Sequence, residues 1–497
     1  MPGTMSEETP QTDRGPASVE PVPSSAKRKR ILLIAGGFIA SLLLFWVGTQ
    51  RHSHQYNTKA RMEKHDQLAI MNFSRRVYRS LHTPGAPFYS GTRNKMPMYP
   101  FLQSLFIRDV KESNDALFER GKTLNVYITM AGLIAVGIVF FRTFPTHLAA
   151  NLSLIAAFSV FVFKAAYFQP DTLSYFLAFG VFLLMWRLFA RGGIVTAIVC
   201  GVLLALAHYC KGTAPPMLML FGVFYGGAAV FALFRKFTTP RVEAASSESG
   251  RPITAVPTAH CRPAWRSFVE LALVFVVALG ILSPYLRESK QRFGSYFYNV
   301  NSTFYMWLDS WDEAKKFSEM YDDRHKAPDI PADQLPGLKT YLHTHTTGQV
   351  VTRMWKGLGA QLSISLHSYG YMVYLIAYGA VIGFAIWKAK LKVVPYLKRQ
   401  PFLAAFLLAY FGGYYALYSW YEYVGRGQRF IIGLFLPALF TLGFIYVRLV
   451  VPSKIQIPIG RRTVPLGVAA NWAITVYCLL DIIYTISYEV VVRNGGS

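Results

Sequence analysis

One polar stretch of the sequence contains an acidic residue and two basic residues, side chains that could accept a proton and bind a phosphate group. Asp66 follows the first apolar run closely, and Arg93 and Lys95 lie further along the same stretch. Pro97 and Pro100 come next; they stop a helix and favour an extended turn, so both cations are expected to be displayed. A carboxylate there can accept a proton from an attacking hydroxyl. Displayed cations beside it suit the phosphate of a lipid carrier at a membrane surface.

The residues that follow Asp66 have the period of an amphipathic helix. Apolar side chains at Ile70, Phe73, Val77 and Leu81 share one side, and Arg75, Arg76 and Arg79 lie between them. Such a helix is expected to lie flat in the membrane interface, with Asp66 near headgroup level.

Membrane-spanning helices are needed to position these groups. Ile31 to Thr49 is uncharged and long enough to cross a hydrocarbon core of about 30 Å. Similar runs recur at 122–141, 145–164, 170–189, 193–209, 214–234, 267–286, 368–387, 401–420, 428–447 and 464–486. The sequence therefore predicts an all-α polytopic membrane protein with about eleven transmembrane helices and short amphipathic helices in its extracytoplasmic loops.

Basic residues predict the orientation of these spans. Lys27 to Arg30 precede the first run, and further basic residues fall in every second connection: Arg142, Arg187, Arg191, Arg235, Lys236, Lys388 to Arg399 and Arg448 to Arg462. Such loops tend to stay in the cytoplasm. The N-terminus is then cytoplasmic, and the polar segments 50–121, 287–367 and 420–429 are extracytoplasmic.

Composition separates the chain into modules and argues against a nucleic-acid partner. The net charge of +25 arises from basic residues at helix ends, where anionic headgroups attract them. Residues 1–26 and 238–264 are too polar to offset the entropy of ordering, so a disordered cytoplasmic tail and linker are expected. Between the tail and the linker lies an N-terminal transmembrane module, 27–237, with its first outer loop at 50–121. After the linker comes a C-terminal transmembrane module, 265–497, with an outer loop at 287–367. The four cysteines have no metal-like spacing.

Four short motifs resemble those of the GT-C membrane glycosyltransferases, and most closely the branch of the protein O-mannosyltransferases and aminoarabinose transferases. They are Asp66 after the first span, Lys95-Met96-Pro97 in the same loop, Gln169-Pro170-Asp171 before a middle span, and Gln428-Arg429-Phe430 before a late span that contains Pro437. The resemblance implies a polyprenyl-phosphate sugar as donor. It also implies an active site on the extracytoplasmic or lumenal face. The Arg/Lys-anchored amino terminus and the lack of an endoplasmic-reticulum retrieval signal favour a bacterial inner membrane as its location.

Residue roles follow from that resemblance. Asp66 matches the catalytic acid and Asp171 the second acid, while Lys95 matches the lysine that contacts the phosphate. The family usually has Glu after the first acid, and this chain has Gln67. Arg93, Lys211, Arg426 and Arg429 are further candidates for binding the donor phosphate. A single base suffices for direct displacement, so inversion at the anomeric carbon is expected; retention would need a second nearby carboxylate.

The outer stretch 287–367 combines aromatic residues with acids, as carbohydrate-binding surfaces often do. It is interpreted either as a lid over the site or as a cap that only shields the bundle. His343 and His345 lack a third ligand, so neither a metal site nor another cofactor is expected. Tyr414, Tyr415 and the run from Tyr418 to Tyr423 are predicted to form an aromatic belt at the interface.

Each candidate also has a purely structural interpretation. Asp66 and Asp171 are placed to cap helices, Lys211 to reach the interface, and Arg426 or Arg429 to pair with Glu422. As a whole, the chain is interpreted as a glycosyltransferase acting on a glycan, lipid or protein hydroxyl. The alternatives are a transporter or lipid flippase, whose charged groups would line a pathway, and a non-catalytic scaffold.

Overall fold

The computed structural model describes residues 24–64, 66–86, 88, 95–212, 214–238, 263–320, 331, 335–367, 371–391, 393–425 and 427–489. The chain divides into two units, 1–45 and 46–497, and the helix α1 (Ser24–Tyr56) begins in the first and ends in the second. All sites discussed below belong to the second unit. The predicted tail and linker fall almost entirely on residues 1–23 and 239–262, outside the described residues.

The prediction of an all-α polytopic membrane protein is confirmed. Within the described residues, nine helical segments are long and apolar enough to cross a membrane. They are α5 (Asn114–Thr143), α6 with η1 and α7 (Thr146–Lys164), α8 (Asp171–Ala190), α10 (Ala214–Thr238), α11 (Ala264–Phe293), α16 (Tyr371–Lys388), α18 (Pro401–Tyr421), η4 with α19 and η5 (Ile431–Ser453), and α20 with the start of η6 (Leu466–Ser487). A shorter apolar helix, α9 (Ile194–Cys210), corresponds to another predicted span, and α1 contains the first.

Several spans combine more than one kind of helix. The second segment consists of α6 (Thr146–Ala156), the π-helical turn η1 (Ala157–Phe161) and α7 (Val162–Lys164). The later ones consist of η4 (Ile431–Leu434), α19 (Phe435–Leu449) and η5 (Val451–Ser453), and of α20 (Leu466–Tyr484) and η6 (Thr485–Glu489). The turn η1 ends six residues before Tyr167. The irregular turn therefore helps to determine the position of the loop that follows it.

Shorter helices are gathered in the segments predicted to be extracytoplasmic. The first contains α2 (Lys59–Lys64), α3 (Asp66–His82) and α4 (Met98–Ser104). The second contains α12 (Val300–Thr303), η3 (Tyr305–Trp307), α13 (Trp311–Met320), α14 (Leu338–Thr344) and α15 (Thr347–His367). Elements on the opposite ends of the spans are α17 (Val393–Arg399) and an antiparallel hairpin of β1 (Gln456–Ile459) and β2 (Arg462–Pro465), in which Ile457 faces Val464.

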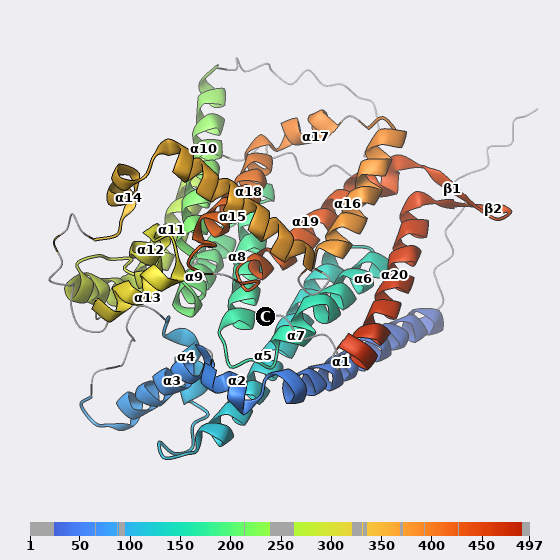
Figure 1. The fold of residues 1–497 in the computed structure, drawn as a ribbon. Coiled ribbons are helices and arrows are strands. Elements are labelled where there is room, and N and C mark those ends of the chain that lie inside the picture. The colour runs from blue at the N-terminus through green and yellow to red at the C-terminus, as the bar shows by residue number, and fades with distance from the viewer. Residues whose placement is uncertain are drawn as a thin grey trace, which may run out of the picture. The chain divides into compact units, whose positions relative to one another are not determined.

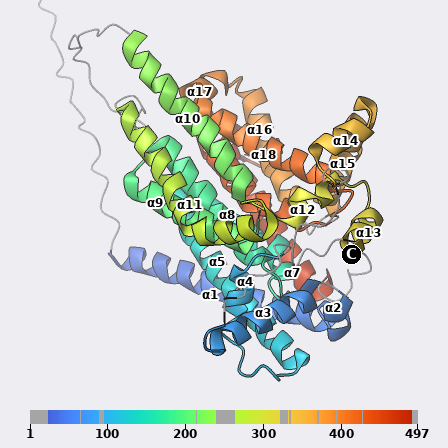
Figure 2. The same cartoon turned by 90° about the vertical axis from the view of Figure 1, so that its left-hand side faces the viewer.

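Close helix pairs hold the candidate site in place. The helix α9 packs along both α8 and α11, and α15 packs along α18 (Figure 1; the view from the side is in Figure 2). Gly357 permits the second contact, because a Cβ atom there would lie 1.9 Å from the carbonyl oxygen of Ser419. Thus α15, in the segment predicted only as a lid or cap, is a long helix that braces the end of α18.

Candidate functional site

Asp66 is the first residue of α3, and its carboxylate binds two cations from distant parts of the sequence. Lys95 Nζ lies 2.9 Å from Oδ1, and Arg429 Nη1 lies 2.8 Å from Oδ2. Within the described residues, neither cationic side chain has another hydrogen-bond partner. The structure therefore brings together three of the predicted site residues.

Asp171 forms a second, more deeply buried ion pair. Its Oδ1 atom accepts a hydrogen bond of 2.7 Å from Lys211 Nζ, and its side chain is 8% exposed against 42% for Asp66. Arg429 interacts electrostatically with Asp171 as well as with Asp66, so the two pairs are coupled. These five residues, Asp66, Lys95, Asp171, Lys211 and Arg429, are called the Asp66 cluster below. Three cations face two carboxylates, which leaves one positive charge.

The cations decide the protonation state of the exposed acid. Partial burial works to raise the pKa of Asp66, but Lys95 and Arg429 outweigh it and hold that pKa well below its usual range. Burial opposes the charged form of Arg429, yet Asp171 and Asp66 raise the pKa of its guanidinium. The carboxylate of Asp66 is therefore ionised at neutral pH.

Gln67 and the apolar side of α3 fix the position of Asp66. Ile70, Phe73 and Val77 share one side of the helix as predicted, but that side is buried within the protein, where the sequence analysis had it facing the membrane interface. Leu81 at the end of the helix is exposed. Gln67 is fully buried, and its amide exchanges hydrogen bonds with that of Asn57, at 2.7 and 3.2 Å. The residue that departs from the family pattern thus has a structural role here, next to the candidate base.

The same amides fix the loop 165–170, which leads into Asp171. Gln67 Oε1 accepts a hydrogen bond from the backbone N–H of Phe168, and Asn57 Nδ2 donates to the carbonyl oxygen of Ala166. From α5, Asn125 Nδ2 donates to the carbonyl oxygen of Tyr167. Buried side-chain amides consequently hold both acids of the cluster in a fixed relation, because unmade hydrogen bonds in such a place are costly.

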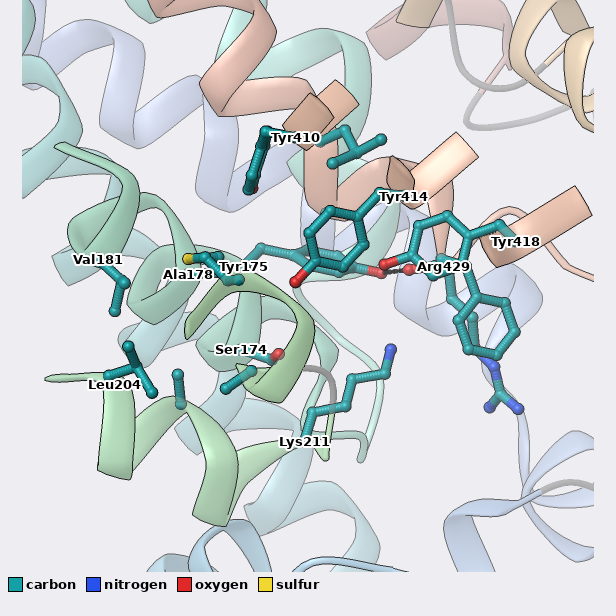
Figure 3. A pocket seen from close by; sticks show the side chains of 16 residues that line it. Ser174, Tyr175, Ala178, Val181, Leu204, Lys211, Tyr410, Tyr414, Tyr418 and Arg429 are labelled. Atoms are coloured by element: carbon teal, nitrogen blue, oxygen red, sulfur yellow. Dashed lines mark hydrogen bonds between the residues drawn. The ribbon is translucent and has the colours of Figure 1, made fainter. Parts of the chain in front are cut away.

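A narrow cavity with an accessible volume of about 30 Å³ begins at Lys211 and Arg429. Tyr410, Tyr414 and Tyr418, spaced by one helical turn on α18, line one side of it. The ammonium of Lys211 and the hydroxyl of Tyr414 point into the same space in Figure 3. Tyr175 also lines the cavity, and its hydroxyl donates to the carbonyl oxygen of Arg429. The cavity therefore joins the charged cluster to an aromatic interior.

This location corrects the prediction of an aromatic belt at Tyr414 and Tyr418. Both side chains are buried inside the helical bundle. Their spacing of four places them on one face of α18, but which face points inward depends on α8 and α10, which pack against it.

The remaining candidates are separated from the cluster or fall outside the described residues. Arg93 and Arg426 lie outside them. His208 is buried, with its ring edge against Tyr285 and Phe297. No group of three or more His, Cys, Asp or Glu side chains suited to hold a metal ion occurs in the part of the chain that the structure describes.

His345 belongs to a separate cluster, made of Asp309, Tyr341, His345 and Arg353 and called the Arg353 cluster below. Asp309 binds His345 Nε2 at 2.7 Å, Arg353 Nη1 at 2.8 Å and the Tyr341 hydroxyl at 3.1 Å. Arg353 also donates to the carbonyl oxygens of Met306, Leu308 and Trp420. This cluster fastens the outer helices α14 and α15 to the end of α18.

Three residues that contact or interact with the surroundings of the Asp66 cluster were not singled out by the sequence analysis: Arg61 on α2, Lys164 at the end of α7, and Tyr167. Lys164 interacts electrostatically with Asp171, Arg429 and Arg61. A charged residue at the end of the predicted run 145–164 was the available signal. The contact of Arg61 with the same loop depends on the tertiary fold, and no sequence pattern indicates it.

Comparison with models of protein families, with curated proteins and with solved structures gives no match for this chain. The fold and site geometry therefore define the class only as a polytopic helical membrane protein with an ion-pair cluster at one end of its spans.

Proposed function

We propose that this protein is an inverting glycosyltransferase that moves a sugar from a polyprenyl-phosphate donor to an acceptor hydroxyl. One observation carries the proposal: the Asp66 carboxylate is bound by two cations, Lys95 and Arg429, and Arg429 also lines a cavity with aromatic walls. A base and phosphate-binding groups are two parts that the reaction needs, and the cavity, with an accessible volume of about 30 Å³, would have to widen to admit the sugar. The resemblance of the four motifs to GT-C enzymes supports the same conclusion.

The donor phosphate would compete with Asp66 for its cations. A polyprenyl-phosphate sugar is a phosphodiester with one negative charge, and the cluster carries one excess positive charge. Lys95 and Arg429 can form charge-assisted hydrogen bonds with phosphate oxygens as well as with a carboxylate. Donor binding then offers these cations a new partner and frees an oxygen of Asp66 to meet the acceptor.

The freed carboxylate would act as general base. The acceptor oxygen forms a bond to the anomeric carbon and gives its proton to Asp66, while the bond from that carbon to the phosphate oxygen breaks. Lys95, Lys211 and Arg429 stabilise the charge that builds on the departing polyprenyl phosphate. Asp171 stays paired with Lys211 and keeps that cation pointed at the cavity mouth.

The proposed orientation puts this site on the extracytoplasmic face of a bacterial inner membrane. The cluster lies at the ends of the spans opposite those that carry Arg142, Arg187 and Arg448, and basic ends tend to remain in the cytoplasm. The cluster also lies at span ends and not at mid-span, which favours an enzyme over a transporter with charges along a pathway.

The proposal is tested by sugar transfer from a panel of radiolabelled polyprenyl-phosphate donors in liposomes. We expect release of sugar with the wild-type protein and a fall of about a hundredfold or more with Asp66→Asn, the scale of a lost general base. Asp115→Asn is the matched control, because it removes an acid whose ion pair with Lys59 is largely exposed.

Two results would count against the proposal. Full activity of Asp66→Asn would remove Asp66 as the base. Absence of turnover with every donor, together with movement of lipid or solute across the same liposomes, would favour the transporter or flippase.

A further inference from the structure

A basic surface lies around the short helix α17, at the end of the bundle away from the Asp66 cluster. In both ribbon views α17 lies on the far side from α3 and α4 (Figure 1 and Figure 2). The sequence has no Asp or Glu from residue 334 to residue 421, but residues 388–399 include five Lys and Arg residues. The cations among them that the structure describes are all exposed; they are Lys388, Lys390, Lys398 and Arg399. The described part of 387–399 is called the α17 surface below.

For three of these cations, the described part of the chain supplies no acidic partner. The side chains of Lys388, Lys390 and Lys398 have no hydrogen-bond or ion-pair partner among the residues that the structure describes. Each ammonium group therefore keeps its donors for an acceptor outside the protein. An anion can bind there without breaking a contact of the described chain.

Apolar side chains are exposed among the same cations. Trp387 is 72% exposed, Val394 58% and Leu397 51%. A soluble anion would cover the cations and leave these apolar side chains in water, which is unfavourable. Tryptophan and lysine both suit a membrane interface, where the apolar part of the side chain meets lipid and the polar end meets the headgroups. The combination therefore favours a lipid over a soluble anion.

The α17 surface also contains an open hollow, with an accessible volume of about 720 Å³. Four apolar and two basic residues line it: Leu391, Val393, Val394, Pro395, Lys398 and Arg399. The basic side chains can form charge-assisted hydrogen bonds with a phosphate group. The apolar walls can cover the glycerol and the first methylene groups of an acyl chain. Charge and apolar surface thus lie side by side, as they do in a phospholipid.

A fixed turn at the end of α16 holds one wall of this hollow. The backbone N–H of Leu391 donates to the carbonyl oxygen of Ile386, and Lys390 has a φ of 49°. Glycine is the usual residue in this left-handed conformation after a helix. Here the position carries a lysine, so the turn adds a cation to the surface. A backbone already held in place lowers the cost of ordering on binding.

We infer that the α17 surface binds an anionic phospholipid of the adjacent membrane leaflet. Its phosphate lies at Lys398 and Arg399, and the start of an acyl chain lies along Val393 and Val394. The predicted orientation makes this the cytoplasmic leaflet. The inference goes beyond the proposed function and does not depend on it.

Native mass spectrometry of the full-length protein in a neutral detergent tests this site by titration with phosphatidylglycerol. We expect the first phosphatidylglycerol to bind at least about tenfold more tightly than phosphatidylcholine with the same acyl chains, because only the former is anionic. Lys398→Gln should weaken that binding about fivefold, the effect of one cation near an anionic headgroup. Equal affinities of the wild-type protein for the two lipids would overturn the inference.

Arg142→Gln is the matched control, because it removes an exposed cation from the end of α5, at the same end of the spans. It should leave the affinity for phosphatidylglycerol unchanged. An equal loss in Arg142→Gln and Lys398→Gln would mean that only the overall positive charge attracts the lipid, and the site would be rejected.

Val394→Ser tests the apolar half of the site without changing its charge. We expect binding of phosphatidylglycerol to weaken about threefold, since less apolar surface is covered. Unchanged affinity would show that the cations act without the hollow and would contradict the inference. Lys398 and Val394 are both exposed, so the variants should unfold at the wild-type temperature in detergent without lipid.

Two further results would assign the α17 surface to another occupant. Displacement of phosphatidylglycerol by inorganic phosphate would indicate a site for a soluble anion. A dimer in the same spectra that phosphatidylglycerol dissociates would indicate that a second copy of the chain covers this surface. Either result would overturn the inference.

Discussion

The Asp66 cluster and the Arg353 cluster are both built on a half-buried aspartate with an arginine, but the two arginines differ in what surrounds them. Arg353 is 3% exposed, contacts three backbone carbonyl oxygens and faces the rings of Tyr341 and Trp420. The Arg429 side chain is 39% exposed and, within the described residues, donates only to Asp66. An arginine whose donors are filled by backbone cannot change partners, whereas one held by a single carboxylate can. The comparison therefore separates a structural ion pair from one suited to binding.

The largest effect is expected from Arg353→Ala, which tests the structural side of the comparison. The change removes a donor from three part-buried carbonyl oxygens and leaves Asp309 without its arginine, so it should lower the free energy of unfolding by about 3 kcal/mol. Thermal unfolding in detergent measures it, with Arg429→Ala as control. That control should keep its melting temperature and lose sugar transfer; equal destabilisation by both changes would contradict the distinction.

A smaller effect is expected from Gln67→Glu, which introduces the residue that the GT-C enzymes resembled by the four motifs usually have at this place. The glutamate keeps the shape but loses the donor to Asn57 and puts a carboxylate in a fully buried place, so we expect about 1–3 kcal/mol of destabilisation. Gln67→Met, which loses the hydrogen bonds without adding charge, separates the two causes. Higher transfer activity in Gln67→Glu would instead indicate a catalytic role for this position.

The smallest effect is a shift in pH dependence when one partner of Asp66 is removed. The pKa of Asp66 is lower in the folded protein than its ordinary value near 3.9. The stability that its ion pairs contribute is therefore fully present above that ordinary value. It is lost only as the pH falls through the lower pKa of the folded protein. The acid limb of kcat/KM for the donor should thus lie below about pH 4.

Lys95→Gln is expected to move that limb upward by about one pH unit, because one of the two stabilising charges is gone. Lys59→Gln removes a cation from an exposed pair with Asp115 and should leave the limb in place. A limb that stays unchanged in Lys95→Gln would show that Lys95 does not set the ionisation of Asp66.

Local patterns in the sequence predicted the helices well, because apolar runs and the period of α3 depend on neighbouring residues. They also singled out Asp66, Lys95, Asp171, Lys211 and Arg429 individually. The pairing of Asp66 with Arg429 joins residues far apart in the chain and required the fold. The burial of Tyr414 and the hydrogen bonds that Gln67 accepts could not be predicted either. The spacing of residues along a helix shows which side chains share a face, but not which part of the protein that face contacts.

Because of the π-helical turn η1, the second span is sensitive to a change in the number of residues in that turn. A π-helical turn holds more residues than an α-helical one, so a deletion within Ala157–Phe161 that restored regular α-helix would rotate one side of the span against the other by about 100°. On one side, Asn151 is bonded to α20; on the other, Lys164 leads into the Tyr167 loop. Substitutions that preserve size can be accommodated in this turn, but a change of one residue in length cannot satisfy both ends at once.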